Sequence, residues 1–148
     1  MVVRASSGVN RLASLKRLTV LHTLVFDLHD NQFGDIGAYA LAMLKGSPVL
    51  HTLSVDLSSN QVGDAGVQAL ATLKDSAALH TLSLSLSYNR TGVPGSSQVG
   101  VAGAQALALL KDSTVLHTLS LNLPDNGLGD AGAQALATLK DSTVLHTL

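Results

Sequence analysis

One tetrapeptide recurs along the chain and constrains its fold more than any other feature. Leu-His-Thr-Leu begins at residues 21, 50, 79, 116 and 145, so the steps between copies are 29, 29, 37 and 29 residues. Treating the eight residues 90–97 (RTGVPGSS) as an insertion restores the step of 29. A fixed period of this length is typical of solenoids, in which each unit packs only against its neighbours. The sequence therefore predicts a stack of similar units.

Within each copy the hydrophobic pattern changes once. In residues 79–89 (LHTLSLSLSYN) leucines alternate with polar residues, and a period of two predicts a strand with one apolar face. In residues 67–74 (VQALATLK) apolar residues recur at helical spacing, which predicts a short helix. Asp64 stands where an N-cap of this helix is expected. Each repeat is predicted to form a strand, a turn, a helix and a return segment.

Stacking such units sets the predicted architecture. Equivalent strands lie side by side as a parallel sheet about 4.8 Å apart, and the helices line the other face. Because helices are wider than strands, the stack curves with the sheet on its inner side. The expected fold is an α/β solenoid shaped as a horseshoe arc, with a parallel β-sheet on the concave face and short α-helices on the convex face.

The repeat pattern also carries a family resemblance. Leu-x-Leu-x-x-Asn followed by Gly-Asp-x-Gly-Ala-x-Ala-Leu resembles the ribonuclease-inhibitor-like class of leucine-rich repeats, over nearly the whole chain. The strand departs from the family pattern, since Leu82, Leu84 and Leu86 precede Asn89 and add one alternating pair. The resemblance implies a repeat solenoid that binds another macromolecule, with a somewhat broader inner face.

These boundaries predict one leucine-rich-repeat domain over 1–148. It is divided into a partial repeat (1–20), four repeats (21–49, 50–78, 79–115 with the insertion 90–97, and 116–144) and the start of a truncated repeat (145–148). Residues 6–16 match the helical half of a repeat and align with 35–45. A polar terminal cap is not recognisable at the C-terminal end, so we expect a fragment of a longer array, or open ends that contact further repeats or another chain.

Composition narrows the classes of function. Nine Lys and Arg residues against ten Asp and Glu give a net charge of −1, which argues against a nucleic-acid binder. Cysteine is absent from the sequence, which excludes disulfides and thiolate chemistry and favours an intracellular compartment, although the organelle stays undetermined. No apolar run approaches the roughly 18 residues that a membrane span requires, so membrane insertion is not expected.

Asparagines recur at one position in each repeat. A ladder of buried side-chain amides that satisfy backbone groups at the sheet edge is the expected role. The members are Asn31, Asn60, Asn89 and Asn126. Asn89-Arg90-Thr91 also fits the glycosylation sequon, but a buried ladder asparagine has no room for a glycan.

Histidines recur in register, and their rings are expected about 5 Å apart. They are His22, His51, His80, His117 and His146. Because no carboxylate or cysteine recurs beside them, packing is favoured over a metal site. A nucleophile paired with one particular histidine is also lacking, so no catalytic residue is assigned and an enzyme is not expected.

The Gly-Asp-x-Gly turns lack the Lys-Ser/Thr of a phosphate-binding loop, so they are interpreted as turns with a helix cap and no cofactor is expected. The third repeat reads Gly100-Val101-Ala102-Gly103, without the aspartate. The start of that helix is therefore predicted to be weaker by about 1 kcal/mol.

The non-core strand positions form the candidate partner-binding surface. One row is Val25, Ser54, Ser83 and Ser120, and the next is Asp27, Asp56, Ser85 and Asn122. His29, Asp30, Tyr88 and Asp125 follow the strands, and Arg90 opens the insertion. The insertion is either a partner contact or a tolerated scar of duplication.

This surface is polar, mildly acidic and poor in the aromatic and arginine anchors of tight interfaces. The resulting prediction is a protein–protein interaction module that binds a macromolecular partner on its concave face. The alternative is an architectural spacer, or a segment of a larger assembly without a dedicated recognition site.

Overall fold

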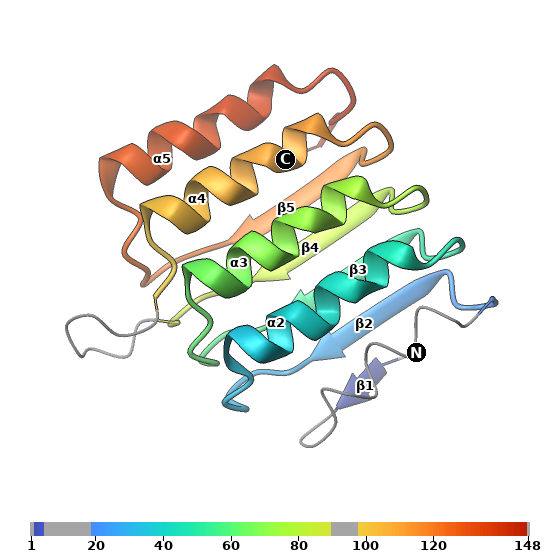
Figure 1. Ribbon diagram of the computed structural model, residues 1–148, viewed down its shortest axis with the longest axis horizontal. Coiled ribbons are helices and arrows are strands. Elements are labelled where there is room, and N and C mark those ends of the chain that lie inside the picture. Colours follow the sequence, from blue (N-terminus) through green and yellow to red (C-terminus); the bar gives the residue numbers. More distant parts are fainter. Residues whose placement is uncertain (1, 5–18, 90–97, 148) are drawn as a thin grey trace.

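The computed structural model describes residues 2–4, 19–89 and 98–147 of the chain. Its strands form one parallel sheet in the order of the sequence (Figure 1). They are β1 (Val2–Arg4), β2 (Thr23–Asp27), β3 (Thr52–Asp56), β4 (Thr81–Ser85) and β5 (Thr118–Asn122). An isolated parallel bridge joins Thr118 to Thr147 beyond β5.

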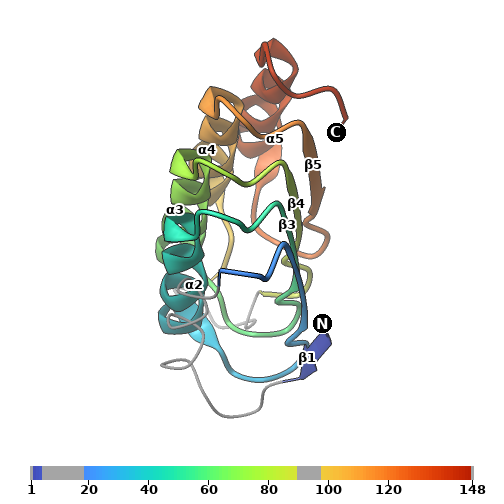
Figure 2. The same ribbon diagram turned by 90° about the vertical axis from the view of Figure 1, so that its right-hand side faces the viewer.

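A short helix follows each of the last four strands and runs directly into a 3-10 turn. The helices are α2 (Gly34–Ala42), α3 (Asp64–Ala71), α4 (Val101–Ala108) and α5 (Gly129–Ala137). The 3-10 turns are η2 (Met43–Gly46), η3 (Thr72–Asp75), η4 (Leu109–Asp112) and η5 (Thr138–Asp141). Figure 2 shows the helices together on one face of the sheet and the opposite face uncovered.

A serine ends each helical segment. Ser76 is extended, and its hydroxyl accepts hydrogen bonds from the backbone N–H groups of Ala78 (3.3 Å) and Leu79 (3.2 Å). Because the hydroxyl offers these N–H groups a partner outside the helix, the chain turns back toward the sheet. Ser113 and Ser142 make the same bonds in the two repeats that follow.

The strands pair without slippage. Leu53 of β3 lies opposite Leu24 of β2 and Leu82 of β4, and Leu82 lies opposite Leu119 of β5. In β3 and β4 buried residues alternate with half-buried ones, because successive side chains point to opposite faces. The predicted parallel sheet, its 29-residue period and the leucine-rich-repeat solenoid with helices on the convex face are confirmed.

The core consists of stacked rows of leucine and valine between the sheet and the helices. One such row is Leu28, Leu57 and Leu86, each fully buried. Helix positions complete it, with Val67 and Leu70 of α3 and Leu107 of α4 also fully buried. Burial of one such side chain contributes about 1.5–3 kcal/mol, so the repeats hold one another in place.

Two predictions lie outside the described residues: the helical half at 6–16 and the insertion at 90–97. The strand β1 is a feature that the sequence pattern did not predict. Its residues Val2, Val3 and Arg4 pair with Val25, Phe26 and Asp27 of β2. In the described part of the chain, no helix is long and apolar enough to cross a membrane.

Candidate protein-binding face and the turns that border it

The uncovered face of the sheet carries the candidate partner-binding residues. Three rows cross it at the strand spacing, and every member is half-buried or exposed. The first row is Thr23, Thr52, Thr81 and Thr118, the second is Val25, Ser54, Ser83 and Ser120, and the third is Asp27, Asp56, Ser85 and Asn122. We call these rows the inner face. The threonine row was not included among the predicted site residues, although the same alternation implies it.

Hydrogen bonds connect residues of the third row with one another and with Ser58, which follows β3. The Ser58 and Ser85 hydroxyls lie 2.9 Å apart, and the Asn122 amide donates to the Ser85 hydroxyl at 3.1 Å. The Asp56 carboxylate accepts from the backbone N–H of Ser58 at 2.9 Å. The side chains are therefore held in place along the row, and the carboxylates lie only at its β2 and β3 end.

The turns after β2, β3, β4 and β5 each hold a non-glycine residue in the left-handed region. The φ angles are 58° at Asp30, 57° at Ser59, 55° at Tyr88 and 55° at Asp125. Short polar side chains tolerate this conformation, whereas a bulky aromatic one rarely adopts it. Tyr88 is nonetheless 60% exposed, so its ring stands at the border of the inner face and is not held there by burial in the core.

Asparagine side chains connect consecutive repeats below these turns. The Asn60 carbonyl oxygen accepts from the backbone N–H of Asn31 (3.1 Å) and Phe33 (2.9 Å), while its amide donates to Leu28 O (2.7 Å) and Ser58 O (2.9 Å). Asn60 is fully buried, so these bonds satisfy backbone groups that water cannot reach.

Asn89 and Asn126 continue the pattern, with a difference at the insertion. Asn89 Oδ1 accepts from Asn60 N (3.0 Å) and Val62 N (2.9 Å). Asn126 donates through its amide to Leu86 O and Leu123 O, but its buried Oδ1 has no partner among the described residues. Asn89 is 1% exposed. Arg90 and Thr91 of the sequon lie outside the described residues.

The histidines stack along the edge where the chain enters the strands. Successive ring centroids lie 5.1, 5.1, 5.4 and 5.6 Å apart, which confirms the predicted spacing. The first two rings also approach through nitrogen, with His22 Nδ1 3.2 Å from His51 Nδ1 and 3.0 Å from Val49 O. Within the described ranges, no group of three or more His, Cys, Asp or Glu side chains is placed to hold a metal ion.

The aspartates of the Gly-Asp-x-Gly turns cap the helix of the following repeat, which corrects the prediction that Asp64 caps its own helix. Asp64 Oδ1 accepts from Gly100 N (2.7 Å) and Gly103 N (2.8 Å) at the start of α4. Asp35 makes the same pair with Gly63 N (2.7 Å) and Gly66 N (2.9 Å) at the start of α3. The side chain reaches across the interface because the next helix packs alongside its own.

This arrangement also corrects the predicted weak start of α4. Asp64 of the preceding repeat caps α4. Because Val101 stands where the other repeats have this aspartate, it is α5 that lacks a cap. The two kinds of helix start have different backbones. Gly63 and Gly100, which receive an aspartate, are extended with φ −104° and −109°, whereas Gly34 and Gly129 have φ of 56° and 57°.

The close approach of the aspartate explains the second glycine of the motif. A Cβ on Gly66 would lie 2.5 Å from Asp35 Oδ1, and a Cβ on Gly103 would lie 2.7 Å from Asp64 Oδ1. Any side chain there would displace the carboxylate from the helix start. At Gly66 and Gly103, contact with the aspartate of the preceding repeat therefore leaves no room for a side chain.

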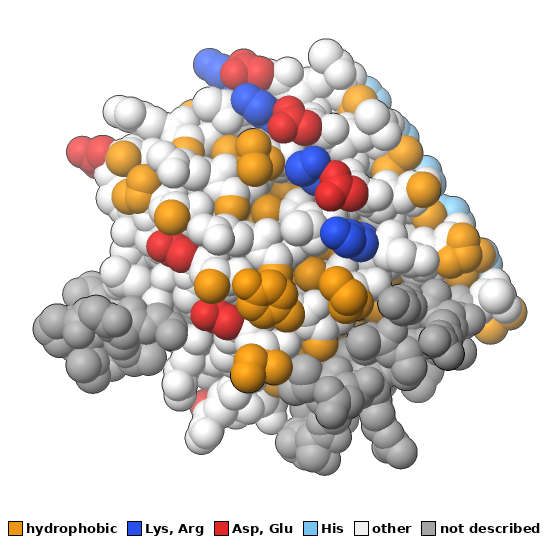
Figure 3. All heavy atoms as spheres, in the orientation of Figure 1, with side chains coloured by type: hydrophobic (Ala, Val, Ile, Leu, Met, Phe, Trp, Pro, Cys, Tyr) orange, Lys and Arg blue, Asp and Glu red, His pale blue; other side chains and the backbone are white. Residues whose placement is uncertain are grey.

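The convex face carries a regular row of charges, which Figure 3 shows running across the helical layer. The row is Lys45, Lys74, Asp75, Lys111, Asp112, Lys140 and Asp141. Lys74 Nζ lies 2.6 Å from Asp75 Oδ1, and this hydrogen bond raises the pKa of Lys74 and lowers that of Asp75. The two side chains are 31% and 51% exposed, so solvent screens the pair and it stabilises the fold little.

The outer side of α2 and the start of η2 differ from the same positions of the next repeat. Ile36, Tyr39 and Met43 are 75%, 53% and 41% exposed, and they form the apolar group near the grey atoms in Figure 3. The corresponding positions of the next repeat are Ala65, Gln68 and Thr72. The sequence interpretation did not single out this group, although its three-and-four spacing is visible in residues 36–43.

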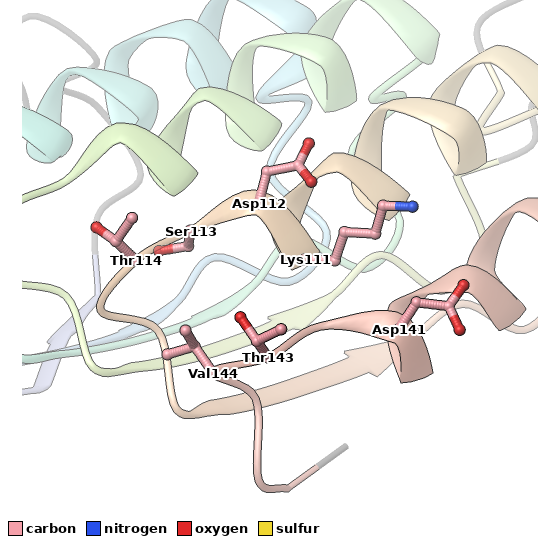
Figure 4. A pocket seen from close by; sticks show the side chains of 7 residues that line it. All are labelled: Lys111, Asp112, Ser113, Thr114, Asp141, Thr143 and Val144. Atoms are coloured by element: carbon pink, nitrogen blue, oxygen red, sulfur yellow. The ribbon is translucent and has the colours of Figure 1, made fainter.

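Two hollows lie at the last repeats. The one in Figure 4, about 390 Å³, opens between the return segments of two repeats, and Lys111, Asp112 and Asp141 are on its rim. Its polar lining repeats in other units, so it is not a singular site. The other, about 410 Å³, is apolar and is formed by Leu119, Leu121, Leu123, Leu136, Ala137, Leu139 and Lys140.

Comparison with known proteins places the chain in a class. The sequence profile described as "Leucine Rich repeat" matches residues 20–42, 50–71 and 115–137. The three matches and the stacked strand–helix units show that the chain contains leucine-rich repeats. Among solved structures, the one titled "Leiomodin-1 Actin-Binding Site 2 (ABS2)" has a similar fold, with a TM-score of 0.70 over 97% of this chain and 79% of that chain at 14% identity. Among curated proteins, none matches the chain significantly.

Proposed function

We propose that the chain is a protein-binding module and that its inner face is the recognition surface. The observation that carries the proposal is the uncovered side of the sheet, where rows of half-buried and exposed polar side chains repeat at fixed spacing. A partner that lies across β2–β5 contacts several repeats at once, and small contributions from each repeat add up to specific binding.

Tyr88 supports the same surface. Its backbone is held at φ 55°, a conformation that costs about 1–3 kcal/mol for a residue of this kind. An exposed tyrosine in a strained turn is an expected anchor for a partner, because tyrosine is enriched among residues that dominate binding energy. Arg90, two residues further along the chain, is proposed as a second contact.

The charges on the inner face suggest the chemistry of the partner at one end. Asp27 and Asp56 lie on β2 and β3, whereas β4 and β5 carry Ser85 and Asn122 at the same row position. A partner with a basic residue over Asp56 of β3 and uncharged polar residues over β4 and β5 fits this pattern, since Arg4 of β1 lies opposite Asp27 in the register. An actin-binding site with a similar fold supports a protein as the partner class.

Site-directed photocrosslinking tests the proposal. A photoreactive phenylalanine at Ser83 reports on the inner face, and the same residue at Gln105, exposed on the outer side of α4, is the matched control. We expect one protein to be crosslinked from position 83 and absent from position 105. A partner crosslinked only from position 105 would exclude the inner face and favour the architectural alternative.

A further inference from the structure

One member of the asparagine ladder differs from the others in the residue that follows it. Asn126 precedes Gly127, whereas the other three members precede Gln32, Gln61 and Arg90. A side chain at the following position hinders attack of its backbone nitrogen on the asparagine amide, and glycine has none. Gln32, Gln61 and Gly127 are all exposed, so water reaches this position of the turn. Asn126 is therefore the ladder amide whose neighbour least opposes ring closure.

The reaction that this pair permits needs only water. The backbone nitrogen of Gly127 bonds to Cγ of Asn126, the Cγ–Nδ2 bond breaks, and Nδ2 leaves as ammonia with the proton of the Gly127 N–H group. The product is a five-membered succinimide ring. Water then opens either of its two C–N bonds, which gives aspartate or isoaspartate at position 126.

Contacts in the folded chain hold both reacting groups. Nδ2 of Asn126 donates to three carbonyl oxygens, those of Leu86 (2.8 Å), Leu123 (3.0 Å) and Pro124 (3.2 Å). The attacking nitrogen of Gly127 donates to Val99 O at 2.9 Å. Oδ1 of Asn126, however, accepts no hydrogen bond from the described residues, whereas Oδ1 of Asn60 accepts two. The amide reacts when this turn opens locally, and the unbonded oxygen makes opening easier.

We propose that Asn126 is a site of spontaneous deamidation and that the product loosens the turn that holds Tyr88. Pro124 O accepts from the Tyr88 N–H (3.2 Å) as well as from the Asn126 amide. A carboxylate in place of this amide donates no hydrogen bond, and its charge faces three carbonyl oxygens that are themselves acceptors. The turns after β4 and β5 are then held together by fewer bonds. Neither the reaction nor the loosening depends on partner binding.

Peptide mapping of the full chain after incubation in mildly alkaline buffer tests the reaction. We expect Asn126 to be converted at least about tenfold faster than Asn31 and Asn60, because it alone of the three precedes glycine. Gly127→Gln restores the Asn-Gln pair of the earlier repeats, and its Cβ first meets the flexible end of the Gln98 side chain at 2.9 Å. This variant should slow conversion to the rate of the other two positions. Equal rates at the three positions of the original chain, or unchanged conversion in Gly127→Gln, would overturn the proposal.

Asn126→Asp reproduces one product in a homogeneous chain and tests the loosening. We expect its thermal midpoint to fall by at least about 3 °C and hydrogen exchange at the Tyr88 amide to quicken at least about tenfold. The matched control is Asn122→Asp, since Asn122 is exposed and bonds the Ser85 hydroxyl, which can donate to a carboxylate in return. The control should change neither value.

The incubated original chain gives a second measurement, in which the folded protein is converted in place. Its Tyr88 amide should show two exchange populations, with the faster one in proportion to the converted fraction. Equal effects of Asn126→Asp and Asn122→Asp, or a single unchanged exchange rate at Tyr88 in the converted chain, would show that the amide does not hold this turn.

Discussion

Oδ1 of Asp64 lies 2.8 Å from the backbone nitrogen of Gly103, so the aspartate of one repeat stabilises the helix start of the next. Neighbouring repeats are thus linked by a charge-assisted polar contact as well as by their leucine core. In a solenoid, where each unit contacts only its neighbours, such contacts contribute to the interface free energy that couples the repeats.

Removing this aspartate should destabilise the chain through the neighbouring helix. We expect Asp64→Val to lower the free energy of unfolding in urea by about 1–2 kcal/mol, because two N–H groups at the start of α4 lose their acceptor. Asp130→Val is the matched control, since it removes the same charge from a helix start without breaking a described hydrogen bond, and it should cost less than about 0.5 kcal/mol. Equal losses in the two variants would contradict the assignment.

Restoring the missing aspartate should convert the start of α5. We expect Val101→Asp to stabilise the chain by about 1 kcal/mol and to change Gly129 from φ 57° to the extended conformation of Gly63 and Gly100. A crystal structure of the variant measures this angle directly. A left-handed Gly129 in that structure would show that the aspartate does not set the conformation of the turn.

At Gly103 the facing aspartate should contribute to the requirement for glycine. Gly103→Ala places a Cβ 2.7 Å from Asp64 Oδ1, and we expect a loss of about 1–3 kcal/mol in the free energy of unfolding. In the Asp64→Val background the cost of the same substitution should change by at least about 0.5 kcal/mol. Strict additivity in this double-mutant cycle would mean that other neighbours cause the loss.

The asparagine ladder should be costly to interrupt at its buried members. Asn89→Ala removes the acceptor of Asn60 N and Val62 N in the interior, so we expect a loss of about 3 kcal/mol in urea unfolding. Asn31→Ala, at a half-buried position where the side chain donates to Leu28 O and His29 O and accepts no bond from the described residues, should cost about 1 kcal/mol. A reversed order would contradict the role assigned to the buried oxygen.

Tyr88 should affect stability and binding in opposite directions. Tyr88→Asn places a residue that tolerates positive φ in the strained turn, so we expect a gain of about 0.5–1 kcal/mol in stability. The same variant should weaken binding of the crosslinked partner at least about tenfold, because an exposed aromatic anchor is lost. Thermal unfolding and binding measured on one preparation separate the two effects. Lower stability, or unchanged affinity, would remove Tyr88 from the proposed contact.

Most of the fold was predictable because the recurring sequence aligns each strand with the next. The recurring Leu-His-Thr-Leu fixes which residues lie opposite one another, and alternation around Leu82 and Leu84 assigns the two faces of the strand. The reach of Asp64 into the next repeat was not predictable from one unit, because an N-cap within the helix and a contact between helices give the same local pattern. Comparison between repeats could have indicated this contact, because the third repeat keeps Gly100 and Gly103 although it lacks an aspartate of its own between them.

The sequence predicted which strand residues form the inner face, but not the conformation of the turn beside it. Alternation placed Ser54 and Ser83 on the open side of the sheet, whereas the left-handed turn at Tyr88 depends on backbone angles that the sequence does not display. The apolar group on α2 escaped notice because Ile36 and Tyr39 match an amphipathic helix as well as they match an exposed patch.

The most direct test of the account compares the affinity of the crosslinked partner for two matched variants. One carries Ser54→Arg, Ser83→Arg and Ser120→Arg on the inner face, and the other carries Gln68→Arg, Gln105→Arg and Gln134→Arg on the exposed side of the helices. Both add three positive charges, so nonspecific charge effects are equal. We predict that the first variant loses binding by at least about tenfold and that the second binds as the original chain does. Undiminished binding by the first variant, or an equal loss in both, would contradict recognition through the inner face.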